Sequence, residues 1–190
     1  HFNKIPVTIF VSTEPLIEGG GYWWSYIKKA LKKGYTACTI PFLKTIPNQN
    51  RLSIVNHLKS FIQIDRESMT VEELKSIATS PYIQIGAHTM THPILTNCNE
   101  DVAASEIKQS KAILDAILPE PVNSFSYPNG DFTEREVKLL KSSGYQIAFA
   151  NKPGLIQLNH KTDFFRLPRF EVLDNVPLNE NVCRMLGVWY

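Results

Sequence analysis

The sequence predicts an α/β fold in which a mainly parallel sheet is surrounded by helices. Apolar, β-branched segments of strand length alternate with amphipathic segments of helical length along the 190 residues. The connections between the strand-like segments are too long for hairpins, so neighbouring strands are expected to run parallel. Periodicity alone leaves both a barrel and an open, doubly wound sheet compatible with this pattern.

Composition is typical of a globular protein, and we expect residues 1–190 to form a single domain. Hydrophobic residues make up 43% of the chain and aromatic residues 11%, which is enough for a core. The net charge of +2 and the lack of a basic stripe interleaved with aromatic residues argue against nucleic-acid binding. Three widely spaced cysteines predict buried thiols, not a disulfide framework. No segment has the length and apolarity of a membrane span.

The expected elements follow from apolar periodicity, helix caps and turn residues. The expected strands cover residues 5–11, 82–85, 122–127, 145–150 and 165–172. The expected helices cover residues 22–33, 52–62, 71–78, 100–118, 134–143 and 179–186. Thr133 with Glu136 forms a capping box, and Gly144 stands where that helix should end. Residues 35–66 show the least regular pattern.

Two of the five histidines, His88 and His92, lie directly behind the apolar run at 82–85. A spacing of four residues places both imidazoles on one face of a helical turn, from which they can reach one metal ion. Parallel α/β proteins carry their sites at the C-terminal ends of strands. The turn at 127–130 and Arg169 also follow or belong to expected strands, so we expect them to lie near the histidines.

These features together resemble the polysaccharide deacetylase family, also called the NodB homology domain or carbohydrate esterase family four. The family's His-Ser/Thr-x-x-His-Pro motif is matched in full by residues 88–93, and the layout of elements downstream also fits. The resemblance spans nearly the whole chain. It implies a distorted, incomplete (β/α) barrel and the metal-dependent removal of acetyl groups from N-acetylated or O-acetylated sugars.

The resemblance also implies roles for single residues. It makes His88 and His92 ligands of one divalent ion, most often zinc, with cobalt and nickel as alternatives, and it makes Thr89 the residue that braces their loop. By the same resemblance, the backbone N–H of Asn129 would be the oxyanion donor, and Tyr127 and Pro128 would contact the substrate. Arg169 would orient an aspartate.

The chain departs from the family pattern in three places. It contains no Asp-Asp pair, the motif that supplies the family's base and third ligand, so we expect that motif and its strand to precede His1. The family's Arg-x-Pro-Tyr is replaced by residues 126–129, Ser-Tyr-Pro-Asn. No histidine follows Arg169 to act as general acid, and His160 and Asp131 are weak substitutes.

Other interpretations therefore stay open. The chain could be a degenerate family member that binds glycan without hydrolysis, or a scaffold in which the two histidines are core residues. Trp23 and Trp24 fit a helix core better than a sugar-stacking surface, and His57 fits a structural role. The compartment also stays open between the cell envelope, the outside of the cell and the cytoplasm, and the oligomeric state is not predicted.

Overall fold

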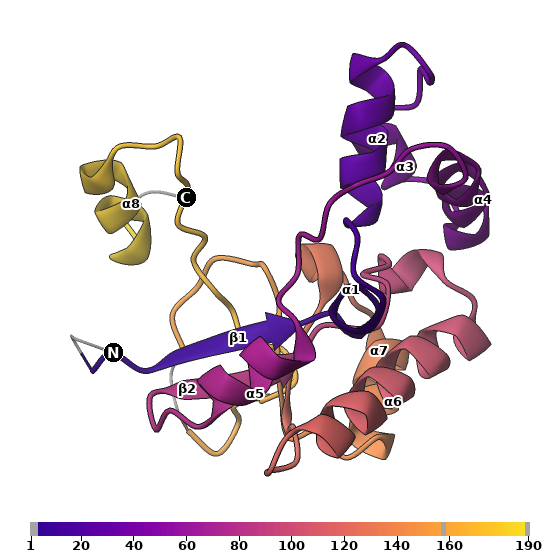
Figure 1. The fold of residues 1–190 in the computed structure, drawn as a ribbon. Helices are drawn as coiled ribbons and strands as arrows, with labels where there is room; N and C mark the ends of the chain where they lie inside the picture. The colour runs from indigo at the N-terminus through magenta and orange to yellow at the C-terminus, as the bar shows by residue number, and fades with distance from the viewer. Residues whose placement is uncertain (1–3, 157–158, 189–190) are drawn as a thin grey trace.

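The computed structural model describes residues 4–156 and 159–188, which contain one four-stranded parallel sheet with the strand order β1-β2-β3-β4. The strands are β1 (Val7–Val11), β2 (Ile83–Ala87), β3 (Ser124–Ser126) and β4 (Ile147–Phe149). Figure 1 shows the helices arranged around this sheet. The prediction of an α/β fold with mainly parallel strands is confirmed.

Every connection between consecutive strands contains at least one helix, as right-handed parallel crossovers require. The helices are α1 (Thr13–Glu18), α2 (Trp23–Lys32), α3 (Ile40–Leu43), α4 (Asn48–Lys59), α5 (Val71–Ala78), α6 (Glu100–Ile117), α7 (Glu134–Ser142) and α8 (Leu178–Met185), with 3₁₀ turns η1 (Leu95–Asn97) and η2 (Pro128–Gly130). The capping box at Thr133 and Glu136 forms as predicted. Helices α1 and α3 were not predicted, because each is shorter than two turns and shows no clear periodicity.

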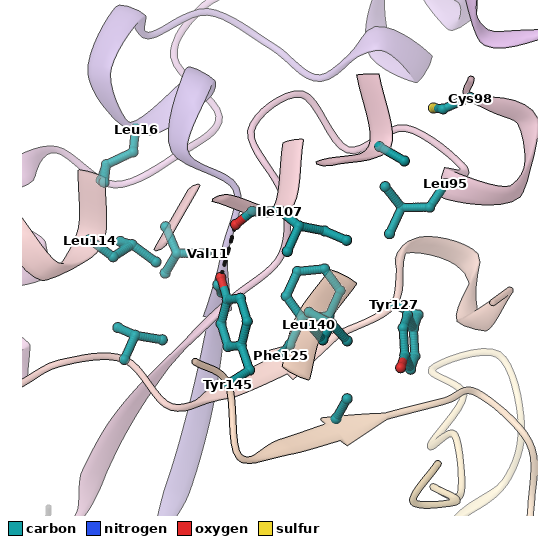
Figure 2. Close-up of a cluster of buried hydrophobic side chains, with 14 of the residues drawn as sticks. Val11, Leu16, Leu95, Cys98, Ile107, Leu114, Phe125, Tyr127, Leu140 and Tyr145 are labelled. Carbon is teal, nitrogen blue, oxygen red and sulfur yellow. Dashed lines mark hydrogen bonds between the residues drawn. The ribbon is translucent and has the colours of Figure 1, made fainter. Parts of the chain in front are cut away.

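The main core lies between the sheet and the helices that follow it (Figure 2). Phe125, at the centre of β3, is fully buried and pairs in register with Ala87 on one side and Ala148 on the other. The hydroxyl of Tyr145 donates to the Ile107 carbonyl of α6 at 3.3 Å, which joins the start of β4 to that helix. This core therefore fixes α6 against the strands.

A second hydrophobic cluster lies within α2, α3 and α4, which we call the helical lobe. All three helices belong to the connection between β1 and β2, and they extend to one side of the sheet in Figure 1. Ile27 and Ala30 of α2 are fully buried there, and Val55 of α4 is 1% exposed. The lobe thus has a core of its own.

The strand expected at 165–172 is wrong as a full strand. Only Leu167 forms a bridge, parallel to Phe149 of β4. Leu167 donates to the Ala148 carbonyl and accepts from the Ala150 N–H, so the pairing begins correctly. The next N–H that could continue the pairing, that of Arg169, donates instead to the Lys152 carbonyl at 3.0 Å, so the ladder stops at Leu167.

The prediction of buried thiols holds for one of the three cysteines. Cys98 is buried, whereas Cys38 and Cys183 are partly exposed, and all three thiols are free. Within the described ranges, no helix is both long enough and apolar enough to cross a membrane.

Gly86 lies where β2 approaches its neighbours too closely for a side chain. A methyl group there would meet Phe10 ring carbons at 2.5 Å and the Ser124 hydroxyl at 2.7 Å. We expect Gly86→Ala to lower the free energy of unfolding by about 1–3 kcal/mol, the usual cost of overpacking. Urea denaturation of the parent protein and the variant measures this difference in the free energy of unfolding.

The Phe10→Ala background supplies the control, since the two ring carbons that obstruct the new methyl group most closely are then absent and only the Ser124 hydroxyl remains. Gly86→Ala should cost clearly less in that background. Equal costs in both backgrounds would show that contact with Phe10 is not the cause.

Candidate metal and active site

The two motif histidines lie on an irregular loop that follows β2, so the expected helical turn is wrong. The backbone adopts positive φ at Thr89 (65°) and again at His92 (57°), which no helix contains. These two reversals bring the imidazole rings of His88 and His92 edge to face, with centroids 4.6 Å apart. Sequence spacing indicated the right pair, but the loop conformation produces the contact.

His88 is oriented by its Nδ1 atom. That nitrogen lies 2.6 Å from the Ser126 carbonyl of β3. Because a carbonyl oxygen only accepts, Nδ1 carries the proton and the Nε2 lone pair is left for a metal ion. Burial, aided by the charge of Arg169, lowers the pKa of His88 to about 4, so the ring is neutral at pH 7.

His92 has a buried Nδ1 atom with no hydrogen-bond partner among the residues that the structure describes. Burial and the neighbouring His88 lower its pKa to about 3, so this ring is also neutral at pH 7. A buried polar atom without a partner is costly, and a metal ion would satisfy it. Both rings are therefore in the protonation state that metal ligands need.

Thr89 is fully buried and connects the two histidines. Its hydroxyl donates to the His88 carbonyl and accepts the N–H of His92 at 3.1 Å. The hydroxyl of Ser12, just beyond β1, donates to the same His88 carbonyl at 2.9 Å. The loop is thus fixed by side-chain hydrogen bonds where regular backbone pairing has ended.

Glu106 is a residue that sequence reasoning missed. Its side chain projects from α6 under the histidine loop and is 7% exposed, and its carboxylate accepts hydrogen bonds from Met90 and Thr91. Burial raises the pKa of Glu106 in spite of these bonds. The available signal was an acidic residue on the apolar face of the predicted helix, three positions after Ala103 and four before Ser110.

The helical lobe contacts the site through its aromatic residues. Trp23 is buried in the lobe core, as expected, and its indole N–H donates to the His92 carbonyl at 3.2 Å. The ring of Trp24 meets the imidazole of His92 edge to face at 4.7 Å. The guanidinium of Arg51 stacks on the Trp23 ring at 4.8 Å. The helical lobe and Glu106 of α6 therefore contact the same short loop, the lobe at His92 and Glu106 at Met90 and Thr91.

A pocket of about 380 Å³ opens at the C-terminal ends of the strands. It is lined in part by Phe10, His88, Ser126, Asn129 and Arg169. The structure thus brings four of the predicted site residues, His88, Tyr127, Asn129 and Arg169, to the border of one cavity. The ring of His92 contacts that of His88 but is not part of this lining.

The expected substrate contacts of the Tyr127 and Pro128 side chains are not supported. Tyr127 is 1% exposed, its ring stacks on Phe132, and its hydroxyl donates to the Phe165 carbonyl at 2.9 Å. Pro128 is also buried. Both side chains are therefore buried, although Tyr127 still borders the pocket.

Asn129 is exposed at the tip of the same turn, with a left-handed backbone at φ 59°. Its side-chain oxygen accepts from the Lys44 ammonium of the helical lobe at 2.7 Å, and its amide donates to Asp131 at 2.6 Å. These contacts fix the conformation of the turn. Asp131 itself is exposed and precedes the Thr133 cap, so it lies outside α7.

Arg169 reaches the pocket from the chain segment beside β4. Its guanidinium donates to the Ala150 carbonyl at 2.9 Å and to the Ser126 hydroxyl at 2.8 Å. Among the ion pairs of the described residues, none involves Arg169. Arg166, by contrast, pairs with Glu134 and Asp163 at the surface.

The other histidines considered do not belong to this site. His57 is exposed and its ring contacts Phe61, while His160 is exposed in a turn at 159–162 and does not line the pocket. Across residues 4–156 and 159–188, no group of three His, Cys, Asp or Glu side chains could hold a metal ion. The described residues therefore bring together two candidate ligands, His88 and His92, without a third.

We expect Thr89→Val to lower the free energy of unfolding by about 1–3 kcal/mol, because the His92 N–H then lacks its acceptor. Thr89→Ser keeps the hydroxyl and lacks the β-branch that disfavours positive φ, so it should remain close to the parent. Urea denaturation of both variants measures this difference. Equal stabilities for Val and Ser would rule out a bracing role for the hydroxyl.

A family model described as polysaccharide deacetylase matches residues 2–148. YxkH of Bacillus subtilis, whose name places it among the polysaccharide deacetylases, is 29% identical over 89 residues, or 47% of this chain and 32% of that protein. This chain therefore covers about a third of the length of that curated relative.

Solved structures of similar fold include one protein each from Streptococcus, Bacillus and Aggregatibacter. Streptococcus pyogenes deacetylase PplD, solved with acetate, superposes with a TM-score of 0.54 at 17% identity, over 94% of this chain and 79% of that chain. BC0361, a polysaccharide deacetylase from Bacillus cereus, superposes with a TM-score of 0.54 at 18% identity, over 95% of this chain and 68% of that chain. A de-N-acetylase from Aggregatibacter actinomycetemcomitans gives 0.52 at 10% identity, over 97% of both chains.

Proposed function

Because the chain belongs to the polysaccharide deacetylase family, we propose that it carries the histidine side of a metal-dependent site that removes acetyl groups from a polysaccharide. The observation that supports this most directly is the pair of neutral imidazoles at 4.6 Å beside an open pocket. Neutral histidines with one nitrogen anchored and another unpaired are suited to metal ligation. Zinc is the first candidate, with cobalt and nickel as alternatives.

The residues present fit such an ion in part. His88 offers Nε2, since its Nδ1 is bound to Ser126, and the unpaired buried Nδ1 of His92 shows that this ring also lacks a partner. When bound, a divalent ion would polarise the acetyl carbonyl and lower the pKa of a water molecule. No third ligand joins the two histidines among the described residues, and we propose that a carboxylate outside them supplies it and also acts as the general base.

The pocket supplies two further groups. The backbone N–H of Asn129, on the constrained turn, is the proposed donor to the oxyanion of the tetrahedral intermediate. Arg169 is held by Ala150 and Ser126, and its charge is the proposed partner of the incoming carboxylate. Burial lowers the pKa of Arg169, which the nearby Glu171 opposes. A second anionic partner would compensate the same desolvation.

Metal uptake tests the two ligands. We expect zinc added to dialysed protein to shift the imidazole NMR signals of His88 and His92, with weak affinity because two protein ligands do not complete a site. His88→Ala and His92→Ala should abolish the shifts. His57→Ala is the matched control, since that histidine is exposed and outside the site. Unchanged zinc binding by both site variants would sink the assignment.

Acetate release tests the reaction. We expect residues 1–190 with zinc to release little acetate from acetylated glycans, because no third side chain among the described residues completes a metal site with the two histidines. Robust turnover by these residues, lost in His88→Ala, would support deacetylation and show that this chain supplies its own base. Glycan retention without acetate release, in a protein that includes the completing carboxylate, would favour the alternative of a binding module.

A further inference from the structure

We infer that Glu106 is a positioning residue, which holds the turn at Met90 and Thr91 so that His88 and His92 face one metal ion. The inference rests on the proposed metal site. Glu106 does not ligate the metal itself, because the hydrogen bonds of its carboxylate reach Met90 and Thr91, two of the three residues between the histidines.

Three donors from two adjacent residues converge on this carboxylate. One oxygen accepts the N–H of Met90 at 2.8 Å and the N–H of Thr91 at 3.0 Å. The other accepts the hydroxyl of Thr91 at 2.6 Å. The carboxylate therefore replaces the backbone acceptors that a strand or helix would have provided for these amides.

The clamped residues lie between the two backbone reversals of the loop. Thr89 precedes them and His92 follows them, and both have positive φ, which is uncommon for any residue but glycine and most unfavourable for the β-branched Thr89. Such conformations persist only where surrounding contacts enforce them. Without the clamp at Met90 and Thr91, relaxation of φ at His92 would turn its ring away from His88.

Apart from its contacts with the loop, the buried carboxylate of Glu106 lowers the stability of the protein. It is 7% exposed, and no cation pairs with it among the salt bridges of the described residues. Its own helix is already fixed by the fully buried Ile107 and Leu114. A buried carboxylate that α6 does not need for packing is explained by the loop that it organises.

The test uses Glu106→Met, which keeps the length of the side chain and removes both acceptors. Zinc titrations followed by the imidazole NMR signals of His88 and His92 should show affinity about 10- to 100-fold weaker, the usual loss when a residue that orients a ligand is removed. Glu106→Gln retains a carbonyl acceptor for the two amides and should recover most of that loss.

Two controls separate positioning from stability. Ile107→Val, at the next position of α6, should cost about 0.5–1.5 kcal/mol of stability yet leave zinc affinity unchanged. Thr91→Ala removes one donor of the clamp without altering α6, and it should weaken zinc binding in the same direction by a smaller factor. It also tests the inference if Glu106→Met does not fold.

Amide hydrogen exchange without zinc gives an independent readout. Met90 and Thr91 should exchange faster in Glu106→Met than in Ile107→Val of matched stability. Parent zinc affinity in a folded Glu106→Met protein, or in Thr91→Ala if that protein does not fold, overturns the inference and leaves the proposed function intact. A parent protein that binds no zinc overturns the metal site, and the role of Glu106 with it.

Discussion

The parallel register of the sheet is the constraint on which the site depends. It places the ends of β1, β2 and β3 at one edge, so that the His88 N–H can donate to Val11 at 2.9 Å while its ring reaches Ser126 at 2.6 Å. His88 thereby bridges three strands that are separated by long stretches of sequence. A slip in register by one residue would point its ring to the opposite face.

Much of this arrangement could be predicted from sequence, because it depends on local periodicity. The capping box of Thr133 with Glu136 and the apolar face of α6 are short-range signals, and both lead to elements that the structure contains. The motif at His88 and His92 likewise indicated the loop where the site would lie. What periodicity could not provide is the left-handed backbone at Thr89 and His92, which depends on contacts with distant residues.

The remaining errors have the same origin. The resemblance implied a substrate contact for Tyr127, yet its side chain is buried and its hydroxyl donates to the Phe165 carbonyl, thirty-eight positions along the chain. Glu106 looked like an ordinary helical residue because its partners, Met90 and Thr91, belong to a loop that has no pattern of its own. Tertiary hydrogen bonds to irregular backbone are the information that a single sequence hides most effectively.

The separate core of the helical lobe has an evolutionary consequence. Residues such as Ile27 and Val55 pack among themselves, so substitutions on the outside of the lobe need not disturb the strands. Yet Trp24 touches His92, and Lys44 reaches Asn129. The rim of the pocket can therefore diversify through the helical lobe, which packs on its own core, while the edge of the sheet that carries the two histidines stays unchanged.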